Sequence, residues 1–305
     1  MNENEKVLIT GGSGKIGKYL TSLLLTEGYQ VVHLSRQQSK FGKVRVFRWD
    51  PDKKVIDPLI FEGIDYIIHL AGADIGKKRW TRKRKDEIVR SRVDSALFLF
   101  KTVSENNIPL KAFISASGTG YYGSVTSERI FTEDDLPSYG FLADTCRKWE
   151  EAACYFLKLG TRTVRIRTAL VLHPDSYILS KLHGPVKKGI LPGLGSGRQY
   201  MPWIHITDLC NIYLKALRDD NMAGAYNAVS PGHVTYLEFI ESFAQAMHKK
   251  AFCLPVPSVI LRTGFGKMAD IVLKGSRVSP GKIQKAGYQF IFDNLPDALA
   301  DIIKF

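Results

Sequence analysis

Short apolar runs rich in β-branched residues alternate with longer segments of helical periodicity through the first 168 residues. The apolar runs lie at residues 7–10, 30–35, 44–48, 66–70, 112–116 and 163–167, and the helical patterns at 15–27, 83–105 and 143–159. Runs that are apolar at nearly every residue are typical of strands covered on both faces, and strands that alternate with helices form βαβ units. The sequence therefore predicts an α/β fold with a doubly wound parallel sheet.

The composition and the hydrophobic pattern of the sequence change after about residue 170. Residues 189–202 are rich in glycine and proline, and helical patterns return at 207–218, 236–248 and 295–303. A chain of 305 residues is long enough for two lobes that share a core. We therefore predict a sheet domain over residues 1–170 and a smaller C-terminal α/β lobe over residues 171–305, whose last segment covers about residues 255–305.

A glycine-rich loop follows the first predicted strand. Its sequence, Thr10-Gly11-Gly12-Ser13-Gly14-Lys15-Ile16-Gly17, satisfies both G-x-G-x-x-G and G-x-x-G-x-x-G. Between a buried strand and an amphipathic helix, such glycines allow a tight turn and let the backbone approach a pyrophosphate, to which the helix N-terminus offers free N–H groups. We therefore predict that a dinucleotide binds to Gly11, Gly14, Lys15, Ile16 and Gly17. The alternative is a glycine turn that only packs the helix on the strand.

The second predicted strand ends at Leu34-Ser35-Arg36, and no acidic residue follows before Asp50. An NAD-selective site usually has an acidic residue there, which accepts hydrogen bonds from the ribose hydroxyls. A guanidinium group is permanently charged and can form two parallel hydrogen bonds to a phosphate. Ser35 and Arg36 therefore predict NADP(H) as the cofactor. If Arg36 only stacks on the adenine, the preference between the two dinucleotides stays open.

The composition gives the chain a formal net charge of +13, from 43 Lys and Arg against 30 Asp and Glu. This excess favours an anionic partner. The positive residues are dispersed and no nucleic-acid-binding motif accompanies them, so we do not expect nucleic acid to be that partner. The one dense run, between residues 77 and 85, has two interpretations. It is either a solvated helix face or a patch that binds phosphate or a partner.

Other features of the sequence predict a cytoplasmic protein. No apolar run approaches the roughly 18 residues of a membrane-spanning helix, and the N-terminus has no basic and apolar leader. The four cysteines are widely separated, without a Cys-x-x-Cys pair or clustered histidines. We therefore expect no membrane partner, no metal site and no disulfide framework. The sequence does not indicate the oligomeric state.

Six further motifs occur in an order that is specific to one family. They are His69-Leu70-Ala71-Gly72, Lys78-Arg79-Trp80, Gly120-Tyr121-Tyr122-Gly123, Trp149-Glu150, Gly195-Ser196-Gly197-Arg198-Gln199 and Trp203-Ile204-His205-Ile206-x-Asp208. With them the chain resembles, over nearly its whole length, the atypical extended short-chain dehydrogenase/reductases of the epimerase-family subgroup, which carry an extra C-terminal segment. The resemblance implies a Rossmann-type fold that binds NADP(H) through residues 1–170 and a substrate lobe in residues 171–305.

The resemblance also implies which other residues surround the cofactor. Leu70-Ala71-Gly72 would lie against it, and Arg92 would face its ribose and nicotinamide end. Ser115 would lie on the nicotinamide floor, and Val171 would border the same cleft. Glu87 would lie at the edge of the cleft, where it either holds Arg92 in an ion pair or only happens to lie five residues before it.

The catalytic residues of ordinary family members are missing from the matched positions. Counting back from Glu150 places Cys146 at the lysine position and Leu142 at the tyrosine position of Tyr-x-x-x-Lys, and Gly118 stands where a serine or threonine would be. A leucine has no proton to exchange, and a thiol without an activating cation is neutral near neutral pH. Cys146 is more typical of a buried core residue than of a nucleophile.

Candidates for the missing acid lie close to the predicted nicotinamide floor. Tyr122, or less favourably Tyr121, could protonate a carbonyl oxygen, with Arg92 or Arg198 supplying the positive charge that lowers the pKa of the phenol. Ser117 could replace the missing hydroxyl group. The alternative is that both tyrosines only pack the interface between the lobes.

Four residues are candidates for a substrate wall, because they combine stacking faces with hydrogen-bonding or anion-binding groups. They are Trp80, Arg198, Gln199 and Trp203. They suit a small-molecule substrate such as a nucleotide sugar or another flat or anionic metabolite. The first functional hypothesis is an NADP(H)-dependent oxidoreductase or epimerase in which a non-standard residue handles the proton. The second is a non-catalytic NADPH-binding or redox-sensing module, and the third is nucleic-acid binding driven by the positive charge.

Overall fold

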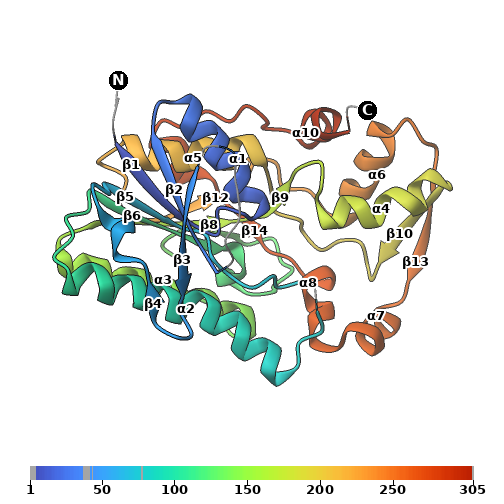
Figure 1. Ribbon diagram of the computed structural model, residues 1–305. Helices are drawn as coiled ribbons and strands as arrows, with labels where there is room; N and C mark the ends of the chain where they lie inside the picture. Colours follow the sequence, from blue (N-terminus) through green and yellow to red (C-terminus); the bar gives the residue numbers. More distant parts are fainter. Residues whose placement is uncertain (1–4, 37–41, 43, 77, 304–305) are drawn as a thin grey trace.

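The computed structural model describes residues 5–36, 42, 44–76 and 78–303. Its largest element is a sheet of eight strands in the order β12-β8-β6-β5-β1-β2-β3-β4 (Figure 1). Neighbouring strands pair in parallel except β3 and β4, which are antiparallel. The chain builds outward from β1 in both directions, so the predicted doubly wound arrangement is confirmed.

All six predicted strands are present, and helices cover both faces of the sheet that they form. Every residue of β5 and four of the five residues of β1 are buried, as expected for central parallel strands. The strands and short turns of this part are β1 (Lys6–Thr10), β2 (Gln30–Ser35), β3 (Arg45–Asp50), β4 (Val55–Ile56), η1 (Pro58–Phe61), β5 (Tyr66–His69), β6 (Ala112–Gly118), η2 (Thr119–Tyr122), η3 (Tyr155–Leu159) and β8 (Arg162–Thr168).

Two pairs of helices cover the sheet. In Figure 1, α1 and α5 lie together on one face, and α2 and α3 lie together on the other. The apolar stripe of α1 faces the sheet, where Leu20 and Leu24 are fully buried. Their bounds are α1 (Lys15–Thr26), α2 (Arg82–Glu105), α3 (Phe141–Cys154) and α5 (Ile206–Arg218). In the described part of the chain, no helix has both the length and the apolar character needed to cross a membrane.

The sheet also contains a strand from beyond the predicted domain boundary. β12 (Gly224–Ala228) pairs in parallel with β8, and α5, which covers the sheet, also lies beyond residue 170. The chain therefore returns to the sheet domain after it has entered the second lobe, and a division at residue 170 does not separate the two. The sequence of β12, Gly-Ala-Tyr-Asn-Ala, has weak strand propensity, which explains why this strand was not predicted.

The second lobe has a hydrophobic core of its own, in which Trp203, Phe239 and Leu299 are fully buried. Its strands form two separate parallel pairs, β9 with β11 and β10 with β13. Its elements are β9 (Leu170–Leu172), α4 (Tyr177–Lys187), β10 (Ile190–Leu194), β11 (Trp203–His205), α6 (Tyr236–Ala246), β13 (Phe252–Val256) and α10 (Leu295–Ile302).

The C-terminal segment crosses from the second lobe back to the sheet domain (Figure 1). Its β14 pairs with β7, and the side chain of Asn227 on β12 donates to the carbonyl oxygen of Ser279 at 3.1 Å. Further along, the backbone N–H groups of Ile291 and Phe292 donate to the carboxylate of Asp208 on α5. These contacts tie the segment to both parts of the chain. The elements involved are β7 (Ile130–Phe131), α7 (Ser258–Phe265), η4 (Gly266–Ala269), α8 (Asp270–Leu273), β14 (Arg277–Val278) and α9 (Gly281–Lys285).

Candidate active site

The glycine-rich loop between β1 and α1 leaves no room for side chains at two positions. Gly11 has a φ of +73°, and a Cβ atom on it would lie 3.0 Å from the backbone of Leu70 and Ala71 at the end of β5. A Cβ atom on Gly17 would lie 2.5 Å from the carbonyl oxygen of Gly11. The glycines therefore bring the loop, the helix and the end of β5 into the close contact that a dinucleotide-binding turn requires.

The first turn of α1 has no side-chain cap. Gly14 is its N-cap residue, and no acidic side chain lies in the turn. Its N–H groups therefore keep the partial positive charge that favours a pyrophosphate. Lys15 adds a formal charge, and its Nζ donates to the carbonyl oxygen of Asp175 in the second lobe. Ile16 is partly buried and packs on the main core.

Two buried histidines support this end of the sheet, and only His69 lies in one of the sequence motifs. Nε2 of His33 on β2 lies 2.8 Å from Oγ1 of Thr21. His69 on β5 is fully buried, with Nδ1 at 2.8 Å from Oγ1 of Thr10 and Nε2 at 3.1 Å from Oγ of Ser95. Burial lowers the pKa of each imidazole to about 4. Both rings are therefore neutral at neutral pH.

Arg36 lies exposed directly after β2, where Ser35 is partly buried. Its charge acts on Glu87 of α2: a hydrogen bond from Arg84 lowers the pKa of that carboxyl most, and the charges of Lys78 and Arg36 lower it further. The charges of three cations, from the end of β2, the loop before α2 and the first turn of α2, thus act on one carboxylate. This excess of positive charge suits a 2′-phosphate.

Glu87 does not pair with Arg92. Its Oε2 accepts a hydrogen bond from Nη1 of Arg84 at 2.8 Å. Residues three apart share a helix face, whereas residues five apart do not. Of the two interpretations of Glu87, the ion pair with Arg92 is therefore wrong, and the five-residue spacing is a coincidence.

Arg92 is instead a buried cation between α2 and α3. Its Nη1 donates to the carbonyl oxygens of Ala73 at 2.9 Å and Ile88 at 3.0 Å, and its Cζ lies 5.0 Å from the ring centroid of Trp149. A Cβ atom on Gly72 would lie 2.8 Å from Cζ. Burial lowers the pKa of Arg92 to about 10, so it stays charged at neutral pH. Its buried Nε has no hydrogen-bond partner among the described residues, which suits an acceptor on a bound ligand.

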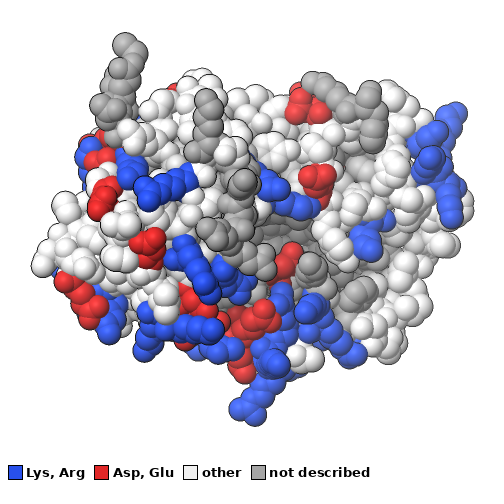
Figure 2. Space-filling model, viewed as in Figure 1, with Lys and Arg blue, Asp and Glu red and all other residues white. Residues whose placement is uncertain are grey.

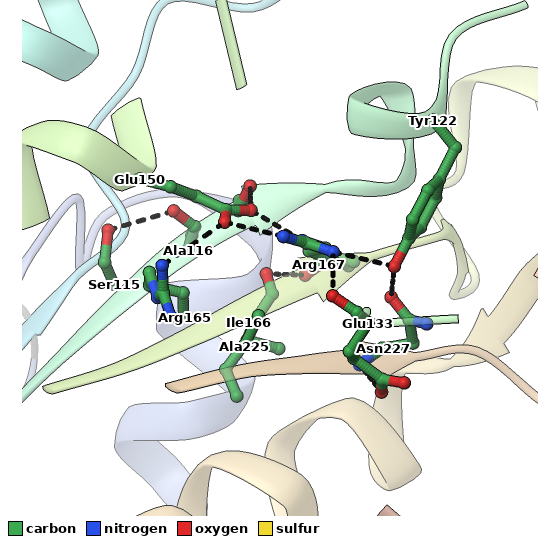
Figure 3. A network of polar contacts seen from close by, with 12 residues as sticks. Ser115, Ala116, Tyr122, Glu133, Glu150, Arg165, Ile166, Arg167, Ala225 and Asn227 are labelled. Carbon is green, nitrogen blue, oxygen red and sulfur yellow. Dashed lines mark hydrogen bonds and ion pairs between the residues drawn. The ribbon is translucent and has the colours of Figure 1, made fainter. Parts of the chain in front are cut away.

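A second buried cation, Arg167 of β8, is the centre of a polar network (Figure 3). Its Nε and Nη2 donate to Oε1 and Oε2 of Glu150 at 2.8 and 3.0 Å, and Ser117 donates to the same Oε1 at 2.8 Å. Nη1 donates to the hydroxyl of Tyr122 at 2.9 Å, and that hydroxyl donates to Oδ1 of Asn227 at 2.7 Å. None of the five residues is more than 5% exposed. The network therefore joins β6, η2, α3, β8 and β12 beneath the predicted nicotinamide floor.

This burial argues against the predicted catalytic roles of Tyr122 and Ser117. The hydroxyl of Tyr122 is enclosed by Arg167 and Asn227, and burial raises the pKa of the phenol. The hydroxyl of Ser117 is held by Glu150. Both side chains stabilise the floor from below, so neither one presents its hydroxyl to a ligand.

The other predicted cofactor residues lie at the carboxyl ends of neighbouring strands. Leu70 and Ala71 are partly buried after β5. Ser115 of β6 is fully buried, and its hydroxyl donates to the carbonyl oxygen of Ala116 at 3.0 Å, as Figure 3 shows. Val171 of β9 is partly buried and packs on the main core. The structure thus brings the predicted residues to one edge of the sheet, although Ser115 offers no free side chain.

Two of the four predicted substrate-wall residues are buried elsewhere. Trp203 is fully buried in the core of the second lobe. Gln199 is 1% exposed, and its Nε2 donates to the carbonyl oxygens of Leu194 at 3.0 Å and Val272 at 2.8 Å. Neither residue can contact a substrate, so the prediction is wrong for both. Gln199 instead joins the loop after β10 to α8.

Trp80 and Arg198 keep accessible surface. Trp80 is partly buried, and its ring lies edge-on to that of Phe141 at the start of α3, with 4.8 Å between the centroids. Arg198 is exposed. Figure 2 shows further Lys and Arg side chains gathered around the first turns of α2, below the hollow of this face. The exposed ones are Lys78, Arg79, Arg82 and Lys83.

The first turn of α2 has no acidic residue, so its cations lie at the positive end of the helix dipole. Such an arrangement is unfavourable for the helix by itself. It therefore favours the interpretation of this run as an anion-binding patch over that of a solvated helix face.

Comparisons with known proteins agree with this geometry. Residues 7–144 match the NAD dependent epimerase/dehydratase family, and residues 256–302 match a domain of unknown function, DUF1731. The chain is 34% identical over 304 residues to the epimerase family protein SDR39U1 of Mus musculus, with 98% of this chain and 99% of the relative covered. It is 33% identical over 297 residues to the epimerase family protein Mb2239 of Mycobacterium bovis, with 97% of each covered. The chain belongs to the epimerase/dehydratase family.

Solved structures of the family share the fold. The crystal structure of human SDR39U1 (isoform 2) with NADPH has a TM-score of 0.85 and 30% identity, with 97% of this chain and 98% of that chain covered. MoeE5 in complex with UDP-glucose and NAD has a TM-score of 0.80 at 20% identity, with 98% and 97% covered. The Rossmann-type fold and the family inferred from the sequence are confirmed, and the expected C-terminal segment coincides with the DUF1731 match.

This member of the epimerase family has no acid or ammonium at the positions that its motifs match to the catalytic dyad. Leu142 is partly buried and Cys146 is buried, both on α3. A Cβ atom on Gly118 or Gly120 would lie 3.7 Å from the sulfur of Cys146. Burial raises the pKa of that thiol to about 11, so it is neutral at neutral pH. Neither Leu142 nor Cys146 can therefore take the proton-exchanging role of the dyad.

Proposed function

We propose that the chain binds NADP(H) at the carboxyl ends of β1, β2 and β5 and acts as an oxidoreductase or epimerase on a small anionic molecule. The observation that carries the proposal is the glycine-rich loop packed against Leu70 and Ala71, combined with Arg36 where an NAD-selective site has an acid. The human relative that was crystallised with NADPH supports the choice of dinucleotide.

The residues present fit this cofactor. The first turn of α1 would hold the pyrophosphate, because its N–H groups have no side-chain cap. Arg36, exposed directly after β2, would hold the 2′-phosphate. The orphaned Nε of Arg92, next to Gly72, would donate to an acceptor on the bound molecule. Bound NADPH would supply the reducing equivalents for a carbonyl substrate.

The positive charge around the cleft supports an anionic substrate. Arg198 and the exposed cations at the start of α2 would attract a phosphate or carboxylate, and the partly exposed ring of Trp80 would stack on a flat group. A nucleotide sugar has both features, and so do other anionic metabolites.

A second candidate function is non-catalytic NADPH binding or redox sensing. It is favoured by the lack of titratable groups at Leu142 and Gly118 and by the neutral thiol of Cys146. The two functions differ in one measurement. A catalytic chain consumes NADPH in the presence of its carbonyl substrate, whereas a sensor leaves NADPH reduced and binds a partner protein differently in the two redox states.

Arg36→Ala tests the cofactor assignment. We expect the affinity for NADPH to fall by about 1.5–3 kcal/mol, or roughly 10- to 150-fold, because a charge-assisted contact with the 2′-phosphate is lost. The affinity for NADH should not change. Isothermal titration calorimetry with each dinucleotide measures both values.

Arg45→Ala is the matched control, because Arg45 is also an exposed arginine of the neighbouring strand β3 but lies at its start, three residues before the position that pairs with Ser35. It should leave both affinities unchanged. Equal losses for NADPH and NADH in Arg36→Ala would rule out the 2′-phosphate contact. If the unsubstituted chain bound neither dinucleotide, the proposed function itself would be refuted.

A further inference from the structure

The structure distinguishes two neighbouring tyrosines of the turn η2. Tyr122 is fully buried, and its hydroxyl lies between Arg167 and Asn227. Tyr121 is only partly buried. Consecutive residues of a 3-10 turn point about 120° apart, so one side chain can enter the core while its neighbour stays at the surface of the floor.

Arg167 gives the phenol of Tyr121 a cationic neighbour. Its Cζ lies 3.5 Å from the centroid of the Tyr121 ring. Burial raises the pKa of Tyr121, the charge of Arg167 opposes that rise, and the charge of Glu150 adds to it. Two hydrogen bonds to Glu150 hold the guanidinium in place. A fixed cation beside a phenol stabilises the phenolate that remains after a proton is given away.

Tyr121 also lies close to the helix from which the dyad is missing. It is the third residue after β6, and a Cβ atom on its neighbour Gly120 would lie 3.4 Å from Cβ of Leu142 on α3. Tyr121 therefore combines partial exposure, a cationic neighbour and a place at the carboxyl edge of the sheet.

We propose that Tyr121, and not Tyr122, is the catalytic acid of this chain and that Arg167 is its positioning residue; this inference rests on the proposed oxidoreductase function. In the reductive direction, the O–H bond of Tyr121 breaks and its proton forms a new O–H bond with the carbonyl oxygen of the substrate. The carbonyl carbon gains a hydride from NADPH, which leaves as NADP⁺. The phenolate of Tyr121 stays next to Arg167 until it takes a proton from water.

Fluorine NMR with 3-fluorotyrosine tests this placement without turnover. The label is placed at Tyr121 in one sample and, as a control, at Tyr139 in another, since Tyr139 lies in the nearby loop and is 95% exposed. Saturating NADPH should shift the resonance at Tyr121 and leave that at Tyr139 unchanged. In a pH titration, Arg167→Met should raise the midpoint of the Tyr121 resonance, because the neighbouring cation is removed.

A kinetic measurement complements the label. With 9,10-phenanthrenequinone as the carbonyl probe, Tyr121→Phe should lower kcat about 100-fold or more, the range of a general acid, while the affinity for NADPH stays the same. Tyr139→Phe should behave like the unsubstituted chain.

The outcomes separate the two proposals. If NADPH binds but leaves the Tyr121 resonance unmoved, or if Tyr121→Phe keeps full turnover, the assignment of Tyr121 is overturned while NADP(H) binding stands. If the unsubstituted chain binds NADPH but reduces no carbonyl probe, the oxidoreductase function fails and the assignment fails with it. If NADPH does not bind at all, the cofactor assignment is the part that is wrong.

Discussion

Replacing Arg167 with methionine should destabilise the fold by about 3–5 kcal/mol, because the substitution leaves a buried carboxylate without its partner. Glu150 is 4% exposed. Its two short contacts with Arg167, at 2.8 and 3.0 Å, would be lost. The hydroxyl of Ser117 at 2.8 Å and Arg165 at 3.8 Å would remain, and neither replaces a bidentate guanidinium. The hydroxyl of Tyr122 would lose a donor as well.

A double-mutant cycle measures this effect. Arg167→Met, Glu150→Leu and the combined variant are unfolded in urea, and the free energies of unfolding are compared. Either single variant leaves one buried charge unpaired, whereas the combined variant leaves none. We therefore expect the combined variant to be more stable than Arg167→Met, with a coupling energy of about 2 kcal/mol or more. In a thermal melt, roughly 2–4 °C per kcal/mol corresponds to a fall in Tm of about 6–20 °C for Arg167→Met.

Arg165→Met is the matched control for this cycle. Arg165 lies on the same strand and faces the same carboxylate, but at 3.8 Å and with 24% of its side chain exposed. Its loss should cost less than about 1 kcal/mol, as for a partly exposed ion pair. If Arg167→Met is no less stable than Arg165→Met, or if the losses in the cycle simply add, the buried pair is not what holds the floor together.

Two further predictions concern the dinucleotide loop and the buried histidines. Gly17→Ala should lower the affinity for NADPH, measured by calorimetry, about tenfold or more, because its Cβ would lie 2.5 Å from the carbonyl oxygen of Gly11. Gly184→Ala is the control and should leave the affinity unchanged, because its Cβ would meet nothing within 4 Å. Equal affinities of the two variants would contradict this prediction. The free energy of unfolding, measured in urea, should fall as the pH decreases from about 6.5 to 4. In this range the imidazoles of His33 and His69 bind protons in the unfolded chain but stay neutral in the folded chain, where their pKa is about 4. A flat profile over this window would show that the burial of the two histidines does not make the stability depend on pH.

The fold could be predicted from the sequence because its signals are local. The central strands β1, β2 and β5 are largely apolar, and the glycine-rich loop lies between a strand and a helix. Each of these signals can therefore be recognised from its neighbours in the sequence. β12 is the exception. Its five residues contain glycine, two alanines and asparagine, and only its pairing with β8 makes them a strand. That pairing depends on the tertiary fold, which local propensity does not report.

The site could be predicted only in part, because several motif residues have structural roles. Gln199 lies in a motif that also contains the exposed Arg198, whereas every named residue of the Trp203 motif is buried, and nothing in either motif tells which side chains turn inward. Arg167 was missed altogether. A signal for it existed, since an arginine within a strand that is otherwise buried needs an anionic partner, and Glu150 lies in the adjacent helix α3.

Two buried arginines flank the part of α3 from which the dyad is missing, and this favours a working site over a decayed one. Arg167 is fully paired with Glu150, so a structural role alone could explain it. Arg92 is different, because it forms no ion pair within the described part of the chain and its buried Nε has no partner there. Burial of such a cation costs several kcal/mol, and an apolar side chain against Trp149 would avoid that cost. We therefore expect a bound ligand to accept a hydrogen bond from Arg92 and so to offset this penalty.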